Sequence, residues 1–253
     1  KQVSISNVQT LEPSDNDIPV FKDDSDSEVN SYNFNYAEDQ IADAVIGSVH
    51  ATDANGDNLT YAITGGNAND WFTINPNNGD ISITAVGAAS VANDFEDALS
   101  NNDHQLTVSV DDGKGGIRQI TVNLSEQNVN EAPTTENGVY LGTTLEDTSV
   151  SVNIQTLLNA STDLDGDTLH LSTLTVDEQY GTLDLVTDSD GNITSATFNP
   201  KADFGGNPEN VTLSYSVTDG TATSDVATAT LGVIAEADAP KLTVTIGDAV
   251  RTE

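Results

Sequence analysis

The sequence has no cysteine and no methionine, and only seven of its 253 residues are lysine or arginine. Without cysteine, neither disulfides nor thiolate metal sites can contribute to the fold. Against 41 acidic residues, the few basic ones leave a net charge of −34, which excludes the positive surface that nucleic acids and anionic membranes require. No apolar run is long enough to cross a bilayer. We therefore expect no nucleic-acid partner and no direct membrane contact.

The chain has neither an initiator methionine nor a signal peptide, and it ends at RTE without an obvious terminator. These ends predict a fragment cut from a longer protein. Its strongly acidic composition is typical of a long extracellular chain that stays soluble through its charge. We expect the fragment to be a monomer.

Short segments with an apolar residue at every second position run through the whole chain. Examples are LTYAI at 59–63, QLTVSV at 105–110, LHLSTLTV at 169–176 and VTLSYSV at 211–217. This period of two is the signature of strands with one buried face. Glycine- and asparagine-rich turns such as NPNNGD at 75–80 separate the strands. The pattern predicts an all-β fold of tandem β-sandwiches.

An internal repeat organises these strands. Four landmarks recur in the same order, and each copy ends in a short acidic border with alanine and proline. The four landmarks are a Glu-Asp pair (38–39; 146–147), an acidic triplet (DANGD at 53–57; DLDGD at 163–167), an aromatic after Asp (DFED at 94–97; DFGG at 203–206) and a DG turn (112–113; 219–220). The border is NVNEAP at 128–133 in the first copy and AEADAP at 235–240 in the second. We expect domains at 29–133 and 134–240, with a remnant of a preceding repeat and linker at 1–28 and the start of a following repeat at 241–253.

The landmarks resemble those of bacterial cadherin-like tandem repeats in large, RTX-type surface adhesins. The first copy follows the cadherin order AED, ATDxD, TGxI, DxE, D-GG and DxNDNxP, while the second is similar to the looser variety EDT, DxDGDxL, PxADFxG and SYxVxDG. The sequence departs from the family pattern at Asn128, where Asp is usual, and at Gly205, where the Glu of DxE would stand. The resemblance implies Greek-key sandwiches of the cadherin/immunoglobulin kind, joined end to end, at a bacterial cell surface or secreted.

The resemblance also implies several calcium ions, clustered at the junctions between domains. Calcium takes six to eight oxygen ligands in flexible geometry, and the acidic landmarks offer such ligands. The ligands carried over are Glu38, Asp94, Glu96, Asn128, the Asn130 carbonyl, Glu131, Asp163, Asp165, Asp167 and Asp219 at the central junction; Asp15, Asp17, Asp53, Asn55, Asp57 and Asp112 at the start of the first domain; and Glu146, Asp203 and Asp238 at the end of the second. The alternative for any single motif is an ordinary Asp/Asn/Gly turn. For DSDGN at 188–192 we expect only a hairpin turn.

Two functions are compatible with these features. The first is a calcium-rigidified extender or scaffold, whose partners are the neighbouring repeats of the same chain. The alternative is a module that binds a glycan or a peptide. Its candidate residue is Trp71, because the alternation in DWFTI turns Trp71 outward. Packing of Trp71 against a neighbouring loop is the other interpretation of this residue, and the one we favour. Catalysis is not expected, since GxSxG and HExxH motifs are absent and the three histidines read as surface residues, His104 in a polar turn.

Overall fold

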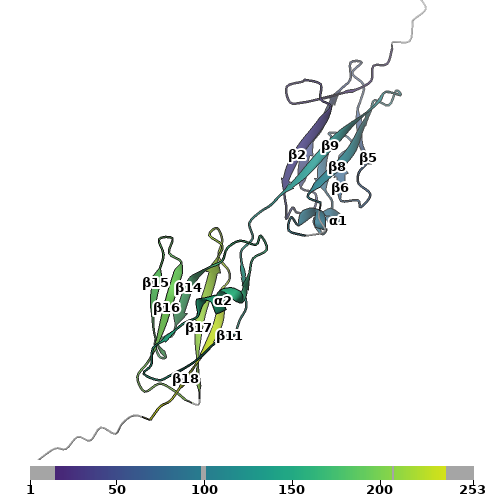
Figure 1. Ribbon diagram of the computed structural model, residues 1–253. Coiled ribbons are helices and arrows are strands. Elements are labelled where there is room, and N and C mark those ends of the chain that lie inside the picture. Colours follow the sequence, from purple (N-terminus) through teal and green to yellow (C-terminus); the bar gives the residue numbers. More distant parts are fainter. Residues whose placement is uncertain (1–14, 98–100, 207, 238–253) are drawn as a thin grey trace, which may run out of the picture. The chain divides into compact units, whose positions relative to one another are not determined.

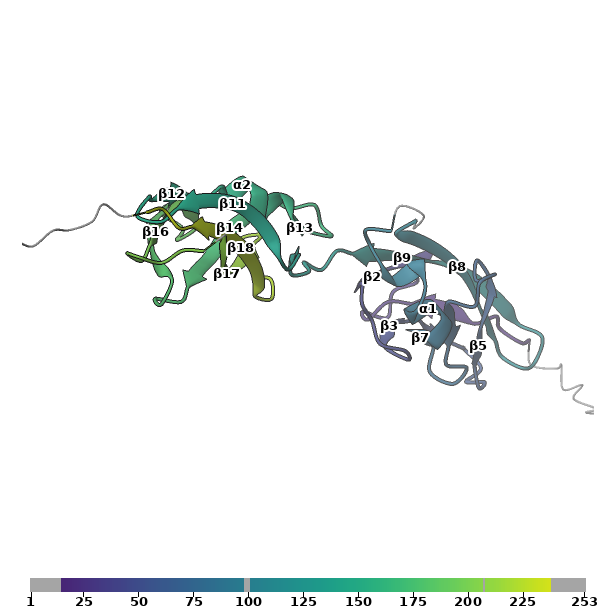
Figure 2. The ribbon, with the colours of Figure 1, turned by 90° about the horizontal axis from the view of Figure 1, so that it is seen from below.

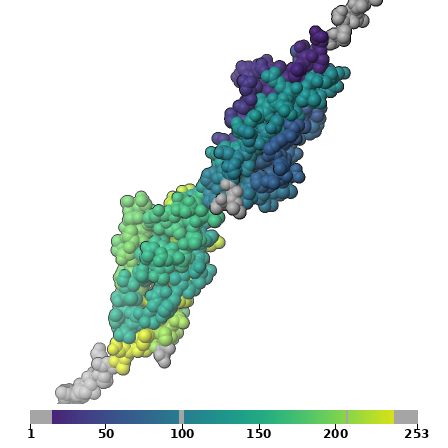
Figure 3. Space-filling view, turned by 45° about the vertical axis from the view of Figure 1, so that its right-hand side comes forward, coloured from purple at the N-terminus to yellow at the C-terminus, as the bar shows by residue number. Residues whose placement is uncertain are grey.

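The computed structural model describes residues 15–97, 101–206 and 208–237 (Figure 1). The chain divides into two compact units, Lys1–Val129 and Asn130–Glu253. Each unit closes around a hydrophobic cluster of its own. Figure 3 shows the outer surface of the chain, coloured along the sequence. The expected start of a following repeat at 241–253 lies outside the described residues. Within the described ranges, no helix is long and apolar enough to span a membrane.

The first unit consists of a four-stranded sheet in the order β2-β9-β8-β5, a three-stranded sheet in the order β3-β7-β6, and a two-stranded ribbon of β1 and β4. Its strands are β1 (Val20–Lys22), β2 (Ser31–Ala37), β3 (Val45–Ser48), β4 (His50–Thr52), β5 (Thr60–Gly65), β6 (Phe72–Ile74), β7 (Asp80–Ile83), β8 (Asp103–Asp111) and β9 (Ile117–Gln127). A short helix α1 (Ala85–Ala88) and a 3-10 turn (Val91–Asn93) follow β7. Figure 2 shows β2, β9 and β8 side by side.

Alternation along the strands builds the core of this unit. In β9, Ile120, Val122 and Leu124 are buried while the residues between them are partly exposed. Phe21 of β1 joins the same cluster and is fully buried. Its strand precedes residue 29, the expected start of the first domain, yet it pairs with β4 and contributes a core side chain.

The second unit has a seven-stranded sheet, in which β11-β18-β17-β14-β16-β12 follow one another and β15 pairs with β16, together with a ribbon of β10 and β13. Its elements are β10 (Thr134–Thr135), β11 (Val139–Leu145), β12 (Val150–Ser151), α2 (Ile154–Asn159), β13 (Ser161–Thr162), β14 (His170–Val176), β15 (Gly181–Thr187), β16 (Ile193–Pro200), β17 (Glu209–Thr218) and β18 (Ala227–Ile234). Helix α2 packs beside β11 and β14 (Figure 2).

The two units repeat one topology. In each, an early strand pairs in parallel with the last one, as β2 does with β9 and β11 with β18. The last strand then pairs antiparallel with the strand before it, as in β9–β8 and β18–β17. This confirms the predicted all-β fold of tandem sandwiches. DSDGN connects β15 to β16 as the expected hairpin turn.

Candidate metal centres

The DANGD loop follows β4 directly at one end of the first unit. Asp53 holds the loop together, because its Oδ1 accepts the backbone N–H groups of Asn55 at 2.8 Å and Asp57 at 3.2 Å. Gly56 takes the left-handed conformation that the tight turn needs, with φ 78°. The second oxygen of Asp53, Oδ2, is buried and has no hydrogen-bond partner among the described residues. Closing the turn requires only Oδ1, so the turn does not account for the burial of Oδ2 without a partner.

Hydrogen bonds attach the segment 15–17 to this loop, so the structure brings these predicted site residues together. The backbone N–H of Asp17 donates to Oδ1 of Asn55 at 2.7 Å, and Nδ2 of Asn55 donates to the carbonyl of Asp15 at 3.3 Å. Asn16, which the sequence analysis did not single out, donates from Nδ2 to Oδ2 of Asp112 at 2.7 Å. All the candidate residues at this end therefore come from three neighbouring segments.

Asp112 is 3% exposed and its carboxylate is held by donors. Oδ1 accepts the N–H groups of Lys114 at 2.7 Å and Gly116 at 2.9 Å. Burial acts to raise the pKa of Asp112, but the hydrogen bonds from Lys114, Asn16 and the glycines outweigh it and lower the pKa below its ordinary value. The group is thereby kept ionised, as a metal ligand must be.

The second unit repeats this arrangement at its DLDGD loop. Asn130 donates from Nδ2 to Oδ2 of Asp219 at 3.0 Å, and the N–H of Glu131 donates to Oδ2 of Asp165 at 3.0 Å. Asn130 and Glu131 thus take the places that Asn16 and Asp17 hold in the first unit. The hydrogen bond from Asn130, followed by those from the backbone, lowers the pKa of Asp219.

The acidic triplet of this loop is compact. Asp163, Asp165 and Asp167 each offer a carboxylate oxygen within 4.8 Å of the others. Oδ1 of Asp163 accepts the N–H of Asp167 at 3.0 Å. Its Oδ2 is buried and, within the described part of the chain, lacks a hydrogen-bond partner, as Oδ2 of Asp53 does in the first unit.

The other end of the first unit carries a second trio, in which Glu38, Asp94 and Glu96 offer oxygens within 4.8 Å of one another. Glu38 is 4% exposed and accepts the N–H groups of Phe95 and Val129, both at 2.7 Å. One carboxylate therefore holds both the DFED segment and the border.

Two side-chain amides position this trio, those of the buried Asn93 and the exposed Asn128. Asn93 exchanges hydrogen bonds with the backbone of Gln40, accepting its N–H at 2.7 Å and donating to its carbonyl at 3.2 Å. The segment that carries Glu38 is thus tied to the 3-10 turn that precedes Asp94. Asn128 donates from Nδ2 to Oε1 of Glu96 at 3.1 Å, so the Asn that replaces the usual Asp acts here as a donor.

Glu126 is a residue that the sequence analysis missed. It is 1% exposed, and neither of its oxygens has a hydrogen-bond partner among the described residues. Burial, followed by the charges of Glu38, Asp94 and Glu96, raises its pKa to about 7. Its position continues the buried alternation of Ile120, Val122 and Leu124. An acidic residue on this apolar face is the feature of the sequence that could have identified Glu126.

At the far end of the second unit the predicted residues do not assemble in the same way. Glu146 is 8% exposed and accepts the N–H of Glu236, as Glu38 accepts the N–H of Val129 from the border of the first unit. Asp203 is exposed, and the described residues form no trio of carboxylates with it or with Glu146. Gly205 explains part of this difference, because it removes the carboxylate that Glu96 supplies in the first unit. Asp238 lies outside the described residues.

The donor sets fit a hard divalent cation. They consist of carboxylate and amide oxygens, which is the chemistry that calcium prefers. Three carboxylates within 4.8 Å of one another repel by on the order of a few kcal/mol per pair at an effective dielectric of about 20. The buried, unpartnered oxygens of Asp53 and Asp163 add a desolvation cost, and a cation would offset both costs.

Trp71 is half-buried, which agrees with the packed alternative. It packs against the first core, and its ring lies 5.5 Å from that of His104 in an edge-to-face contact. His104 belongs to β8, so its predicted place in a polar turn was wrong; the alternation of β8 extends to it. Burial lowers the pKa of His104, and the charge of Asp103 opposes this shift. Trp71, Phe72 and His104 line a hollow of about 300 Å³.

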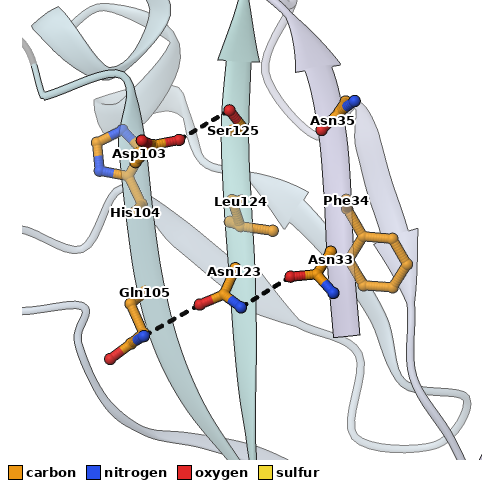
Figure 4. Close-up of a pocket in the computed structure, with 9 residues that line it drawn as sticks. All are labelled: Asn33, Phe34, Asn35, Asp103, His104, Gln105, Asn123, Leu124 and Ser125. Atoms are coloured by element: carbon orange, nitrogen blue, oxygen red, sulfur yellow. Dashed lines mark hydrogen bonds between the residues drawn. The ribbon is translucent and has the colours of Figure 1, made fainter. Parts of the chain in front are cut away.

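A second hollow, of about 410 Å³, lies over β2, β9 and β8. A row of amides crosses it (Figure 4): Gln105 donates to Asn123 at 3.0 Å, and Asn123 donates to Asn33 at 2.8 Å. Ser125 donates to Asp103 beside this row at 2.7 Å. These side chains bond one another across the strands, so they stabilise the sheet.

Comparison with family models matches residues 32–127 to the Cadherin domain and residues 129–234 to the Cadherin-like domain. No curated protein sequence matches the chain. Among solved structures, the chain is similar to Drosophila N-cadherin EC1-4, with a TM-score of 0.54 and 19% identity over 86% of this chain and 49% of that chain. It is also similar to the human Desmocollin-1 ectodomain, with a TM-score of 0.51 and 19% identity over 88% of this chain and 42% of that chain. A third similar structure is human Protocadherin-24 EC1-2, with a TM-score of 0.53 and 18% identity over 88% of this chain and 100% of that chain. The chain thus spans about half the length of the first two. At these identities the likeness shows the fold, and together with the two family matches it shows that the chain carries two cadherin-type domains in tandem.

Proposed function

We propose that this chain is a calcium-binding segment of a bacterial cell-surface adhesin, in which the tandem domains act as a calcium-rigidified extender or scaffold. The observation that carries the calcium assignment is the pair Asp53 and Asp163. At equivalent places in the two domains, each uses Oδ1 to close its loop and keeps a buried Oδ2 without a partner among the described residues. Two independent copies of one such feature favour a bound cation over a chance turn.

The ligands would come from the three segments already described in each domain. Asp53, Asn55 and Asp112 would act with Asp15 and Asp17, and Asp163, Asp165 and Asp219 would act with Asn130 and Glu131. Glu38, Asp94 and Glu96 would bind at the far end of the first domain. Calcium bound on both sides of the peptide bond between Val129 and Asn130 would restrict the freedom of a short linker.

The extender assignment draws on the cadherin-type fold and on the resemblance of the landmarks to repeats of bacterial adhesins. In such a chain the tandem domains transmit position and force, and no catalytic step is required of them. The localisation that follows is extracellular, at a bacterial surface or secreted, where calcium at millimolar levels suits sites of this class.

The test is calcium titration by calorimetry, paired with small-angle X-ray scattering with and without a chelator. We expect calcium binding, a higher melting temperature and a narrower distribution of dimensions. Asp53→Asn and Asp163→Asn should each weaken binding. Asp190→Asn, in the exposed hairpin turn, is the control and should not. Unchanged melting temperature and dimensions on chelation would overturn the proposal.

A glycan- or peptide-binding role is the second candidate, and the hollow beside Trp71 is the observation that favours it. An aromatic ring at the wall of a hollow can stack on a sugar. Loss of binding to a glycan array in Trp71→Ala, with retention in Trp71→Phe, would support this role. Equal binding by the two variants and the unchanged chain would remove Trp71 as the ligand-binding residue.

A further inference from the structure

We infer that Glu126 is a further metal-ligating residue, whose buried carboxylate forms the inner wall of a calcium site with Glu38, Asp94 and Glu96 at the far end of the first domain. The inference rests on the proposed calcium binding and extends it. Glu126 lies outside the acidic landmarks, on the core face of β9.

The position of Glu126 is defined by strand pairing on both sides. In the parallel pairing of β2 with β9, Tyr36 lies opposite Glu126 and Ala37 opposite Gln127. The N–H of Glu38 donates to the carbonyl of Gln127 at 3.1 Å, so the ladder continues by one residue. Because side chains alternate along a strand, Tyr36 and Glu38 face the same side. On the other flank, the N–H of Glu126 donates to the carbonyl of Asn102 at 2.7 Å.

The carboxylate of Glu126 needs a partner that the neighbouring side chains do not supply. Both of its oxygens are buried, and neither accepts nor donates a hydrogen bond within the described residues. The hydroxyl of Tyr36, the cross-strand partner of Glu126 in β2, donates instead to the carbonyl of Ala92 at 2.8 Å. The one ion pair in the described ranges joins Arg118 to Glu28, so no salt bridge neutralises Glu126.

Glu126 lies next to residues that carry its own sign of charge. Its side chain shares the core face with Tyr36, its partner in the ladder, and with Glu38, which follows Tyr36 by one alternation along the chain. Glu38 in turn forms a trio with Asp94 and Glu96, whose oxygens lie within 4.8 Å of one another. A buried carboxylate without a hydrogen-bond partner next to this trio is costly in the absence of a cation, and a divalent cation would lower that cost for all four residues.

The chemistry favours calcium over magnesium. Four carboxylates can supply six or more oxygens through mixed monodentate and bidentate contacts, which suits the larger, flexible coordination sphere of calcium. Magnesium demands near-ideal octahedral geometry and usually keeps several waters, which a carboxylate buried to 1% exposure does not readily accommodate.

The experiment compares the full chain with Glu126→Gln, Glu126→Leu and the control Glu178→Gln, which removes one charge at an exposed turn. Calcium binding is measured by calorimetry, and melting temperature is measured in chelator and in calcium. We expect Glu126→Gln to weaken calcium binding at one class of site by about 10-fold or more, the range found when groups around a metal are changed. In chelator its melting temperature should equal or exceed that of the unchanged chain, because a buried charge has been removed.

Glu126→Leu extends the apolar face of β9. It serves as a second variant because the buried amide of Glu126→Gln could itself destabilise the fold. We expect it also to weaken calcium binding while it raises the melting temperature in chelator. If both variants bind calcium as Glu178→Gln does, Glu126 is not a ligand and the inference is overturned while the proposed function stands. If the unchanged chain binds no calcium, the proposed function and the inference both fall.

Discussion

Asn130 donates a hydrogen bond from its side-chain amide to Oδ2 of Asp219 at 3.0 Å, and thereby attaches the start of the second domain to its DG turn. Asn16 makes the same contact with Oδ2 of Asp112 in the first domain at 2.7 Å. In each repeat, an asparagine that precedes the first strand thus donates to the carboxylate of a turn about 90 residues later. The two domains therefore share this hydrogen bond as well as the sequence motifs.

The pKa of Asp219 should rise toward its ordinary value in Asn130→Ala, because Asn130 is the largest cause of its depression. A carboxyl with a lowered folded-state pKa stabilises the fold above its unfolded-state pKa, and this stability is lost as the pH falls through the folded-state value. Asn130→Ala should therefore reduce the acid-dependent loss of stability. Carboxyl NMR titration checks the shift; Asn16→Ala is the control and should move Asp112, leaving Asp219 unchanged.

In chelator, Glu126 should make the stability of the first domain fall as the pH rises, which is opposite to the effect of Asp219. Its folded-state pKa of about 7 lies above the ordinary 4.5, so its protonation favours the fold. Its contribution is fully present below about 4.5 and is lost as the pH rises through about 7. His104, whose pKa burial lowers, acts in the other direction below 6.5.

The comparison that isolates Glu126 is therefore between the unchanged chain and Glu126→Gln, with His104 present in both. In chelator, the variant should gain melting temperature relative to the unchanged chain as the pH rises from about 4.5 to about 7. A constant difference between the two chains across this interval would contradict the raised pKa.

Gly116→Ala should disturb the candidate metal centre at the start of the first domain. A Cβ at this position would lie 2.2 Å from Oδ2 of Asp112 and 3.2 Å from Nδ2 of Asn16, so the contact between these side chains must shift. We expect a loss of about 1–3 kcal/mol in the free energy of unfolding and weaker calcium binding. Gly113→Ala is the control: it has open space around its Cβ but a φ of +68°, so it should cost stability with little effect on calcium.

Phe21→Ala should destabilise the first domain by about 3–5 kcal/mol, the range for removing a buried phenylalanine. Phe21 is fully buried and makes an edge-to-face contact with Tyr32 at 6.3 Å. Denaturant unfolding followed by the fluorescence of Trp71 reports on this domain. Ile18→Ala, in the same segment but 56% exposed, should change the free energy of unfolding by no more than about 0.5 kcal/mol. Equal effects of the two changes would contradict a core role for β1.

Much of the fold and part of the candidate site could be predicted from local patterns. Apolar alternation identifies strands because a β-strand turns successive side chains to opposite faces. The DANGD and DLDGD loops could be recognised because Asp, Asn and Gly close tight turns through their own backbone. The segment at 15–17 could be grouped with Asn55 and Asp112 because the landmarks repeat in a constant order, and hydrogen bonds join these residues in the structure.

Local patterns could not place Glu126 beside Glu38, because this contact depends on the parallel register of β2 and β9, which brings together residues about 90 positions apart. They also could not show that Trp71 is covered by His104, since cross-strand neighbours are chosen by sheet order. Alternation, turn chemistry and charge are properties of neighbouring residues, and the sequence by itself determined them. Which carboxylates are buried, and which of them lack a partner, was decided by tertiary structure, because burial is the joint effect of strands that are distant in the chain.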